Sequence, residues 1–178
     1  MIICISGLSG CGKNTVGEIV ARKLGLLEVK ISFKDEARRR KMGLMEFQQL
    51  ATQDEKFDIA LDKRIAAEAS KGNCVVMTWL GPWVVKNADF RVWLEVGEEE
   101  RARRVAKRDG ILYAEALAHV RARDNNNRER YTKYYGINID DHSKFDMVIK
   151  GEGKTPEQIA DEIIRGAICA ERKCAFFP

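Results

Sequence analysis

The chain has 178 residues, of which 45% are hydrophobic and 33% charged, and its formal net charge is +4. This length suits one domain with a sizeable core, and so small a positive charge does not by itself indicate nucleic-acid binding. No apolar run approaches the roughly 20 residues that cross a bilayer, and the N-terminal stretch lacks the basic and apolar segments of a secretory signal. We therefore expect a cytoplasmic monomer that binds neither membranes nor specific nucleic-acid sequences.

Strand-like and helix-like segments alternate along the chain. Continuous apolar runs predict strands in residues 2–6, 26–32, 72–80, 88–96 and 145–151. Helices are predicted in residues 15–25, 33–43, 44–51, 54–70, 98–109, 113–135 and 155–168. Such alternation predicts an α/β fold in which about five parallel strands are covered by helices on both faces. A ligand is expected at the carboxyl end of the first strand.

The five cysteines are irregularly spaced and predict no disulfide framework. Cys4 and Cys74 lie in apolar runs, so we expect them to be small core residues. Cys169 and Cys174 lie on the last predicted helix or beyond it, with no histidine nearby to complete a zinc site. Cys11 lies in a glycine-rich loop, at a position where any small side chain is expected to suffice.

Residues 7–15 read GLSGCGKNT and fit the phosphate-binding pattern G-x-x-x-x-G-K-[ST] up to Lys13. The glycines allow backbone N–H groups to converge on phosphate oxygens at the positive end of the following helix. Lys13 adds a cation that follows the β- and γ-phosphates during transfer. A strand before the loop and an amphipathic helix after it make this P-loop match specific. The residues expected to bind the nucleotide are Gly7, Ser9, Gly10, Cys11, Gly12, Lys13, Asn14 and Thr15.

Asn14 stands where the pattern has a serine or threonine hydroxyl that helps to hold Mg²⁺. Its amide oxygen is an acceptable substitute in principle, because Mg²⁺ keeps several waters and takes few protein ligands. Thr15 lies about 100° further round the helix and more naturally bonds an α-phosphate oxygen. We therefore expect nucleotide binding, with Asn14 as a weakened metal ligand.

The segment from Arg121 to Tyr135 has no aliphatic side chain larger than alanine, which indicates that it is not part of the core. If it is helical, Arg123, Asn127 and Arg130 share one face. Arginines on a mobile lid would neutralise the charge that develops during phosphoryl transfer and would exclude water. The alternative is a solvated, charged helix.

The segment EEERARRVAKRDG, residues 98–110, also carries many charges. The pairs Glu99–Arg103 and Glu100–Arg104 have the i,i+4 spacing that is common on exposed helices. We favour a surface helix, although Arg101, Arg104 and Arg108 could instead point toward the loop.

Asp54, Asp58 and Asp62 recur every four residues, an arrangement that destabilises a helix unless the charges are compensated. We favour a solvated face for this acidic stripe. The candidate partners are Lys34, Arg38, Arg64 and, alternatively, an amine of a ligand.

Together these motifs resemble archaeal-type (type 2) cytidylate kinases, which are P-loop nucleoside monophosphate kinases. The resemblance covers the whole chain and is carried by the loop and by the segments DEKFDIALDKR, RDNNNRERY and YYGINIDD. It implies one kinase domain over residues 1–178 with a three-layer P-loop core, an arginine lid at about 110–140 and acceptor-binding helices at about 32–70. It also implies an ATP site at residues 7–15 and transfer of the γ-phosphoryl group to CMP or dCMP. The acidic stripe would then face the acceptor.

Two positions depart from the family pattern in the acceptor half. Lys34 stands where an arginine usually grips the acceptor phosphate, and a lysine cannot reproduce the bidentate fork. Trp79 replaces a second expected arginine and could stack on a base or roof the core.

Our leading hypothesis is therefore a (d)CMP kinase that uses ATP and Mg²⁺. Lys13, Arg123 and Arg130 would act on the transferring group, and Lys34, Asp58, Asp62, Arg64 and Trp79 would contact the acceptor. The alternatives are a kinase of another small acceptor and a non-catalytic ATP-binding module.

Overall fold

The computed structural model describes residues 1–176, and side chains as far as residue 172. Its centre is one sheet of five parallel strands in the order β2-β3-β1-β4-β5. The strands are β1 (Ile2–Ser6), β2 (Leu27–Val29), β3 (Cys74–Met77), β4 (Phe90–Glu95) and β5 (Met147–Lys150). The predicted five-stranded parallel α/β fold is thus confirmed. β1 spans its whole predicted run, and the other four strands are shorter than the apolar runs that predicted them.

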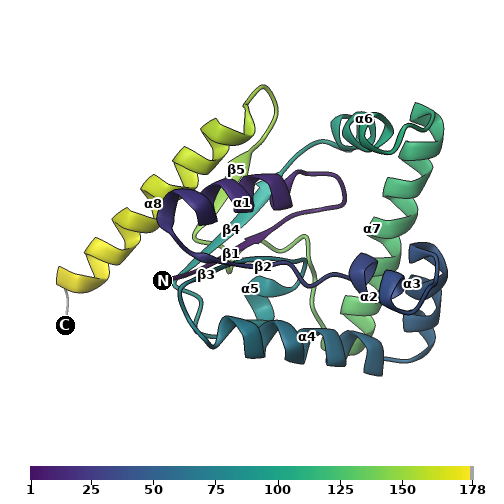
Figure 1. The fold of residues 1–178 in the computed structure, drawn as a ribbon, viewed down its shortest axis with the longest axis horizontal. Helices are drawn as coiled ribbons and strands as arrows, with labels where there is room; N and C mark the ends of the chain where they lie inside the picture. The colour runs from purple at the N-terminus through teal and green to yellow at the C-terminus, as the bar shows by residue number, and fades with distance from the viewer. Residues whose placement is uncertain (177–178) are drawn as a thin grey trace.

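Helices cover both faces of this sheet (Figure 1). On one face, α1 (Lys13–Leu24) packs along α8 (Pro156–Phe176) over a large apolar core that includes Ile3, Val75 and Val92. On the other face, α4 (Lys56–Ala69) and the short α5 (Gly81–Val84) enclose a second core that includes Cys4 and Cys74. Both cysteines are fully buried, as predicted, and the side chain of Cys174 lies outside the described residues.

Four further helices extend the molecule beyond the carboxyl ends of the strands, at the right of Figure 1. They are α2 (Phe33–Arg39), α3 (Leu44–Gln53), α6 (Glu98–Asp109) and α7 (Tyr113–Tyr135). The long helix α7 packs against α6 near its beginning and contacts α3 further along. It therefore connects the part of the molecule beside the phosphate loop with the part built from α2, α3 and α4.

The helix ends follow the local sequence signals. Gly136 adopts a left-handed conformation (φ 63°) directly after α7, at the predicted break. Thr155 accepts a hydrogen bond from the Gln158 N–H at 3.2 Å, and the Gln158 side chain accepts one from the Thr155 N–H at 2.8 Å. The helix α5 is too short to be recognised from periodicity. Within residues 1–176, no helix is both long and apolar enough to cross a membrane.

Candidate active site

The phosphate loop connects β1 to α1 and is held in a conformation that needs glycine. Gly10 and Gly12 have φ values of 81° and 97°. A Cβ at Gly10 would lie 2.8 Å from the carbonyl oxygen of Arg101, so the loop packs directly against α6. Lys13 folds back over the loop and donates a hydrogen bond to the Gly7 carbonyl at 3.0 Å.

The loop opens into a cavity of about 860 Å³ that continues between α7 and the helices α2–α4. This volume lies in the upper part of the range for small-molecule sites. Near the loop the lining includes Gly10, Gly12, Lys13, Asn14, Thr15, Arg104, Arg108, Arg123 and Lys154. Near α2–α4 it includes Phe33, Lys34, Gln48, Asp58, Asp62 and Trp79. We call these the donor end and the acceptor end.

Trp79 lies at the junction of the two ends. Its ring centroid is 5.3 Å from the Lys13 ammonium and 6.2 Å from the ring of Tyr131. Burial lowers the pKa of Lys13, because removal from water disfavours the charged form. A cation–π contact of this kind partly compensates for that cost. Trp79 therefore holds Lys13 as well as forming part of the acceptor wall.

Two arginines of α6, Arg101 and Arg104, turn toward the phosphate loop, so our preferred interpretation of a surface helix was wrong for these two, whereas Arg103 and Arg108 are exposed. Arg101 is 4% exposed and donates hydrogen bonds to the carbonyls of Val96 and Ser9, both at 2.9 Å. Arg104 donates to the Cys11 carbonyl at 3.0 Å. The sequence could not reveal this, because the partners of these arginines are up to 93 residues away. The predicted pairs Glu99–Arg103 and Glu100–Arg104 do form.

One face of the arginine-rich part of α7 is buried, although its lack of aliphatic side chains indicated that it lay outside the core. Asp124, Asn127, Arg130 and Tyr131 are each at most 4% exposed. Asp124 and Asn127 accept hydrogen bonds from distant segments, and Arg130 pairs with a carboxylate of α4. A buried segment of this kind is a polar core, which apolar periodicity does not detect.

Arg130 is fully buried and forms an ion pair with Asp58, with Nε–Oδ2 at 2.9 Å. It also donates to the side-chain oxygens of Asn126 and Asn127, and its guanidinium lies 4.4 Å from the centroid of the Phe33 ring. Arg130 is not part of the cavity lining described above. The expectation that it faces the transferring group is therefore corrected: its donors are used within the protein.

Arg123, unlike Arg130, lies on the face of α7 that is turned toward the cavity. It lines the cavity, and its Nε is buried without a hydrogen-bond partner among residues 1–172. Burial lowers its pKa, with the nearby Arg108 acting in the same direction. A partly buried cation whose Nε has no partner among the described residues attracts an anion. Arg123 is thus available to bind a phosphoryl group.

The acidic stripe is not a solvated face. Asp58 is 2% exposed, and burial raises its pKa although Arg130 opposes the shift. Asp62 accepts a hydrogen bond from the Tyr135 hydroxyl, and burial raises the pKa of Asp62 to about 6. Both carboxylates line the cavity, and Asp54 instead accepts a hydrogen bond from the Lys56 N–H at 3.0 Å.

The cations expected to compensate this stripe lie elsewhere. Arg64 pairs with Glu36 at 3.4 Å and is not part of the described cavity lining. Lys34 is exposed and lines the cavity. The actual partners, Arg130 and Tyr135, come from α7, more than 70 residues away.

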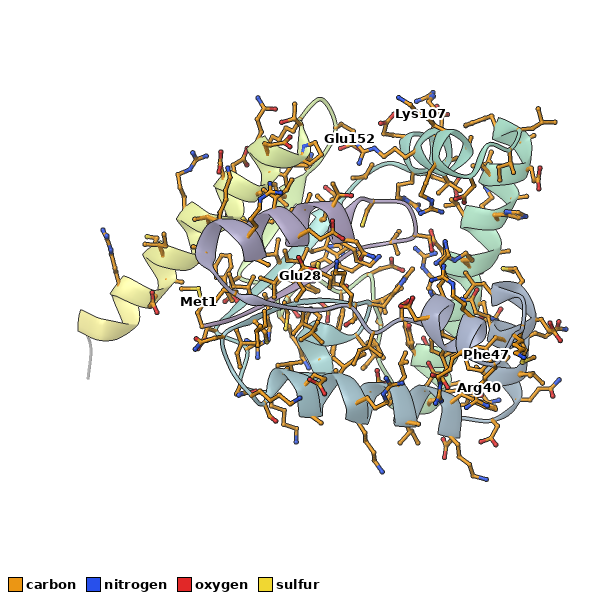
Figure 2. The ribbon with its side chains drawn as sticks, in the orientation of Figure 1. Met1, Glu28, Arg40, Phe47, Lys107 and Glu152 are labelled. Carbon is orange, nitrogen blue, oxygen red and sulfur yellow. The ribbon has the colours of Figure 1, made fainter. Side chains whose placement is uncertain are left out.

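A buried amide network completes the acceptor end and was missed in the sequence. Gln48 of α3 donates to the Asn127 side-chain oxygen at 3.2 Å, and Arg130 donates to the same oxygen at 2.9 Å. Gln48 and Asn127 also line the cavity. Figure 2 shows side chains filling the space around α2, α3 and α4, where Phe47 and Arg40 are labelled. No local sequence signal marks Gln48, because its partner is 79 residues away.

The sequence pattern of the cytidylate kinase-like family matches residues 27–152 of this chain. The chain belongs to this family. A cytidylate kinase of Pyrococcus horikoshii is 38% identical over 170 residues, covering 94% of this chain and 88% of its own. Cytidylate kinase 2 of Borrelia garinii is 37% identical over 171 residues, covering 92% of this chain and 96% of its own. These kinases resemble the chain along nearly its whole length.

A solved structure supports the fold assignment. Shikimate kinase from Bacteroides thetaiotaomicron superposes with a TM-score of 0.61 at 20% identity, covering 96% of this chain and 98% of its own. Sequence similarity this low relates the folds alone. The chain of this cytidylate kinase-like protein thus has a kinase fold, with the phosphate loop at the carboxyl end of β1.

Proposed function

We propose that this protein transfers the γ-phosphoryl group of ATP to CMP or dCMP. The observation that carries the proposal is the continuous cavity that joins the phosphate loop to the acidic wall formed by Asp58 and Asp62. A donor phosphate and an acceptor can meet in such a cavity out of bulk water, as phosphoryl transfer requires. The family membership supports the same reaction.

The donor end fits a nucleotide triphosphate. The first-turn N–H groups of Lys13, Asn14 and Thr15 have no acceptor within α1, since the first intrahelical bond of the loop runs from Val16 to Gly12. These N–H groups and the ammonium of Lys13 form an anion site at a helix N-terminus. ATP is the donor that we propose for this site.

The residues present also fit a magnesium ion that arrives with the nucleotide. Asn14 is exposed and lines the cavity next to Lys13, so its amide oxygen is available as a neutral ligand. A bound Mg²⁺ would neutralise charge on the phosphates, and it needs few protein ligands because phosphate oxygens and water supply the others. We propose Asn14 as its protein ligand.

Transfer itself would rest on cations rather than on a protein nucleophile. Lys13 and Arg123 line the cavity and are both partly buried, which strengthens their interaction with developing negative charge. Arg130 would support the site by fixing Asp58 and Asn127. Residues 110–140, which include Arg123, would act as the lid, and Arg108 lines the cavity just before this segment.

The acceptor end suits a base that carries an amine. Asp62 presents a carboxylate to the cavity, and a carboxylate accepts hydrogen bonds but does not donate them when ionised. The 4-amino group of cytosine is a donor, whereas the corresponding oxygen of uracil is an acceptor. We therefore propose that Asp62 favours CMP over UMP, that Phe33 and Trp79 contact the base, and that Lys34 contacts the acceptor phosphate.

We also propose an oligomeric state and a cellular location. A monomer in the cytoplasm that uses nucleotide substrates is consistent with a chain in which no described helix crosses a membrane. We propose no direct acceptor contact for Arg64, which pairs with Glu36 outside the described cavity lining.

The proposal is tested by measuring ADP formation from Mg·ATP with CMP, dCMP, UMP, AMP or GMP, beside a control without acceptor. We expect turnover with CMP and dCMP and little with the control. Turnover that is equal with and without acceptor, or that only another monophosphate supports, would contradict the proposal.

A further inference from the structure

Two buried residues outside the main cavity hold both backbone groups of Ser9 in the phosphate loop. Asp124 of α7 accepts a hydrogen bond from the Ser9 N–H at 3.1 Å. Arg101 of α6 donates one to the Ser9 carbonyl at 2.9 Å. The two side chains form an ion pair at 2.6 Å and are 4% and 3% exposed. Neither is part of the cavity lining among the described residues, so neither is placed to touch a nucleotide.

These contacts fix the direction of the N–H of Gly10, a residue that lines the cavity. The Ser9 carbonyl and the Gly10 N–H belong to one planar peptide unit, and the chain has no cis peptide bond. In a trans peptide the two groups point in opposite directions. Because the Ser9 carbonyl points toward Arg101, the Gly10 N–H points away from Arg101, and Gly10 lines the cavity.

The same arrangement recurs two residues later. Arg104 lies one helical turn beyond Arg101 on α6 and binds the Cys11 carbonyl at 3.0 Å. The Gly12 N–H therefore points away from Arg104, and Gly12 also lines the cavity. Two carbonyls of the loop are thus drawn toward α6, and the N–H groups that follow them point away from these two arginines.

We propose that Arg101 and Asp124 are positioning residues that hold the phosphate loop in its anion-binding conformation. This inference rests on the proposed ATP site and adds to it two side chains that lie outside the loop motif. Asp124 keeps Arg101 neutralised and in place, and it ties the loop to α7. Since α7 also carries Asn127 and Arg130, one helix supports both ends of the cavity.

The test replaces the charged pair by neutral residues of similar shape, in the double variant Arg101→Gln/Asp124→Asn of the full chain. Dissociation constants for ATP alone and for CMP alone are measured by calorimetry. We expect ATP to bind at least roughly tenfold more weakly, because hydrogen bonds to a charged group lose their alignment, while CMP affinity stays within about twofold. The matched control is Arg128→Gln/Asp140→Asn, which neutralises an exposed pair that α7 makes at 2.9 Å.

A folded double variant that binds ATP like the wild type would overturn the inference, as would an equal loss of ATP and CMP affinity. If the double variant does not fold, Arg101→Lys provides the same test. It keeps the charge opposite Asp124 but cannot bond Val96, Ser9 and Asp124 together, so ATP affinity alone should fall. Failure of the wild-type chain to bind ATP or CMP would instead refute the proposed function.

Discussion

The donor end and the acceptor end of the cavity are held together by different kinds of interaction. At the donor end, residues 10–15 line the cavity, and Arg101 and Arg104 of α6 bind carbonyls of the loop. At the acceptor end, the contacts are made by buried side chains that pair with one another across α3, α4 and α7, among them Asp58 and Arg130. The first end combines main chain with cations such as Lys13 and Arg123, and the second end is built on a buried network of paired charges.

This difference explains why unusual residues are tolerated at one end and are expected to be costly at the other. A backbone cradle depends little on the side chains at Cys11 and Asn14, provided that the loop keeps its conformation. A buried ion pair responds strongly when one partner is removed, because the remaining charge is left unpaired. The acceptor end should therefore be the more sensitive part of the fold.

The largest effect is expected for Arg130→Met. This change leaves Asp58 buried without its cation, and we expect the free energy of unfolding to fall by about 3–5 kcal/mol. Urea denaturation followed by circular dichroism measures this loss. The double variant Arg130→Met/Asp58→Leu should recover much of it, because it removes both charges.

The matched control is Arg128→Gln on the same helix, which breaks an exposed pair with Asp140. Its cost should stay within about 1 kcal/mol. If Arg130→Met costs no more than this control, the buried network does not hold the acceptor end.

At the donor end, Lys13→Ala should affect the rate rather than the fold. The ammonium that stabilises the transferring group is lost, and turnover should fall by roughly 10²–10³-fold, while the backbone amides remain. ADP formation measures the rate, and the melting temperature serves as the check on folding. A variant that melts far below the wild type would show that Lys13 is needed for the fold, contrary to the comparison drawn above.

The pH dependence of acceptor binding tests Asp62. Burial raises its pKa to about 6, so the carboxylate is ionised at pH 7 and becomes protonated as the pH falls through 6. An acceptor amine then loses its hydrogen-bond acceptor, and the KM for CMP should rise about tenfold between pH 7 and pH 5. The KM for ATP should change much less.

Asp62→Asn is the control for this experiment. It should raise the KM for CMP at pH 7 and remove most of the rise below pH 6. A wild-type KM for CMP that is flat between pH 7 and pH 5 would show that Asp62 does not contact the acceptor.

The smallest effect is expected at Trp79, where the two ends meet. Trp79→Ala removes the ring 5.3 Å from the Lys13 ammonium, an interaction of about 0.5–1 kcal/mol. The KM for ATP should rise about two- to fivefold, and Trp79→Phe should fall between this variant and the wild type. If the KM for ATP is unchanged in both variants, Trp79 does not support Lys13 and is part of the acceptor wall alone.

The two ends also differ in how far the sequence predicts them. The phosphate loop is a continuous motif between a strand and a helix, so residues 7–15 could be recognised locally. The strands and most helices could also be predicted, because apolar periodicity is a local pattern in the sequence. The acceptor network could not be predicted, because a charged side chain such as Asp58 carries no local sign of the buried Arg130 that pairs with it 72 residues later.

Burial of charge was consequently the point at which the interpretation of the sequence failed. Asp58, Arg101 and Arg130 all belong to charged segments that normally face water, and all are at most 4% exposed. Long-range ion pairs override the tendency of each residue taken alone.

The most direct measurement follows the γ-phosphoryl group itself. ATP labelled at the γ-phosphate is incubated with CMP, Mg²⁺ and the protein, and the products are separated. We predict that the label appears in CDP. Label found only in inorganic phosphate, or retained in ATP although both nucleotides bind, would contradict it.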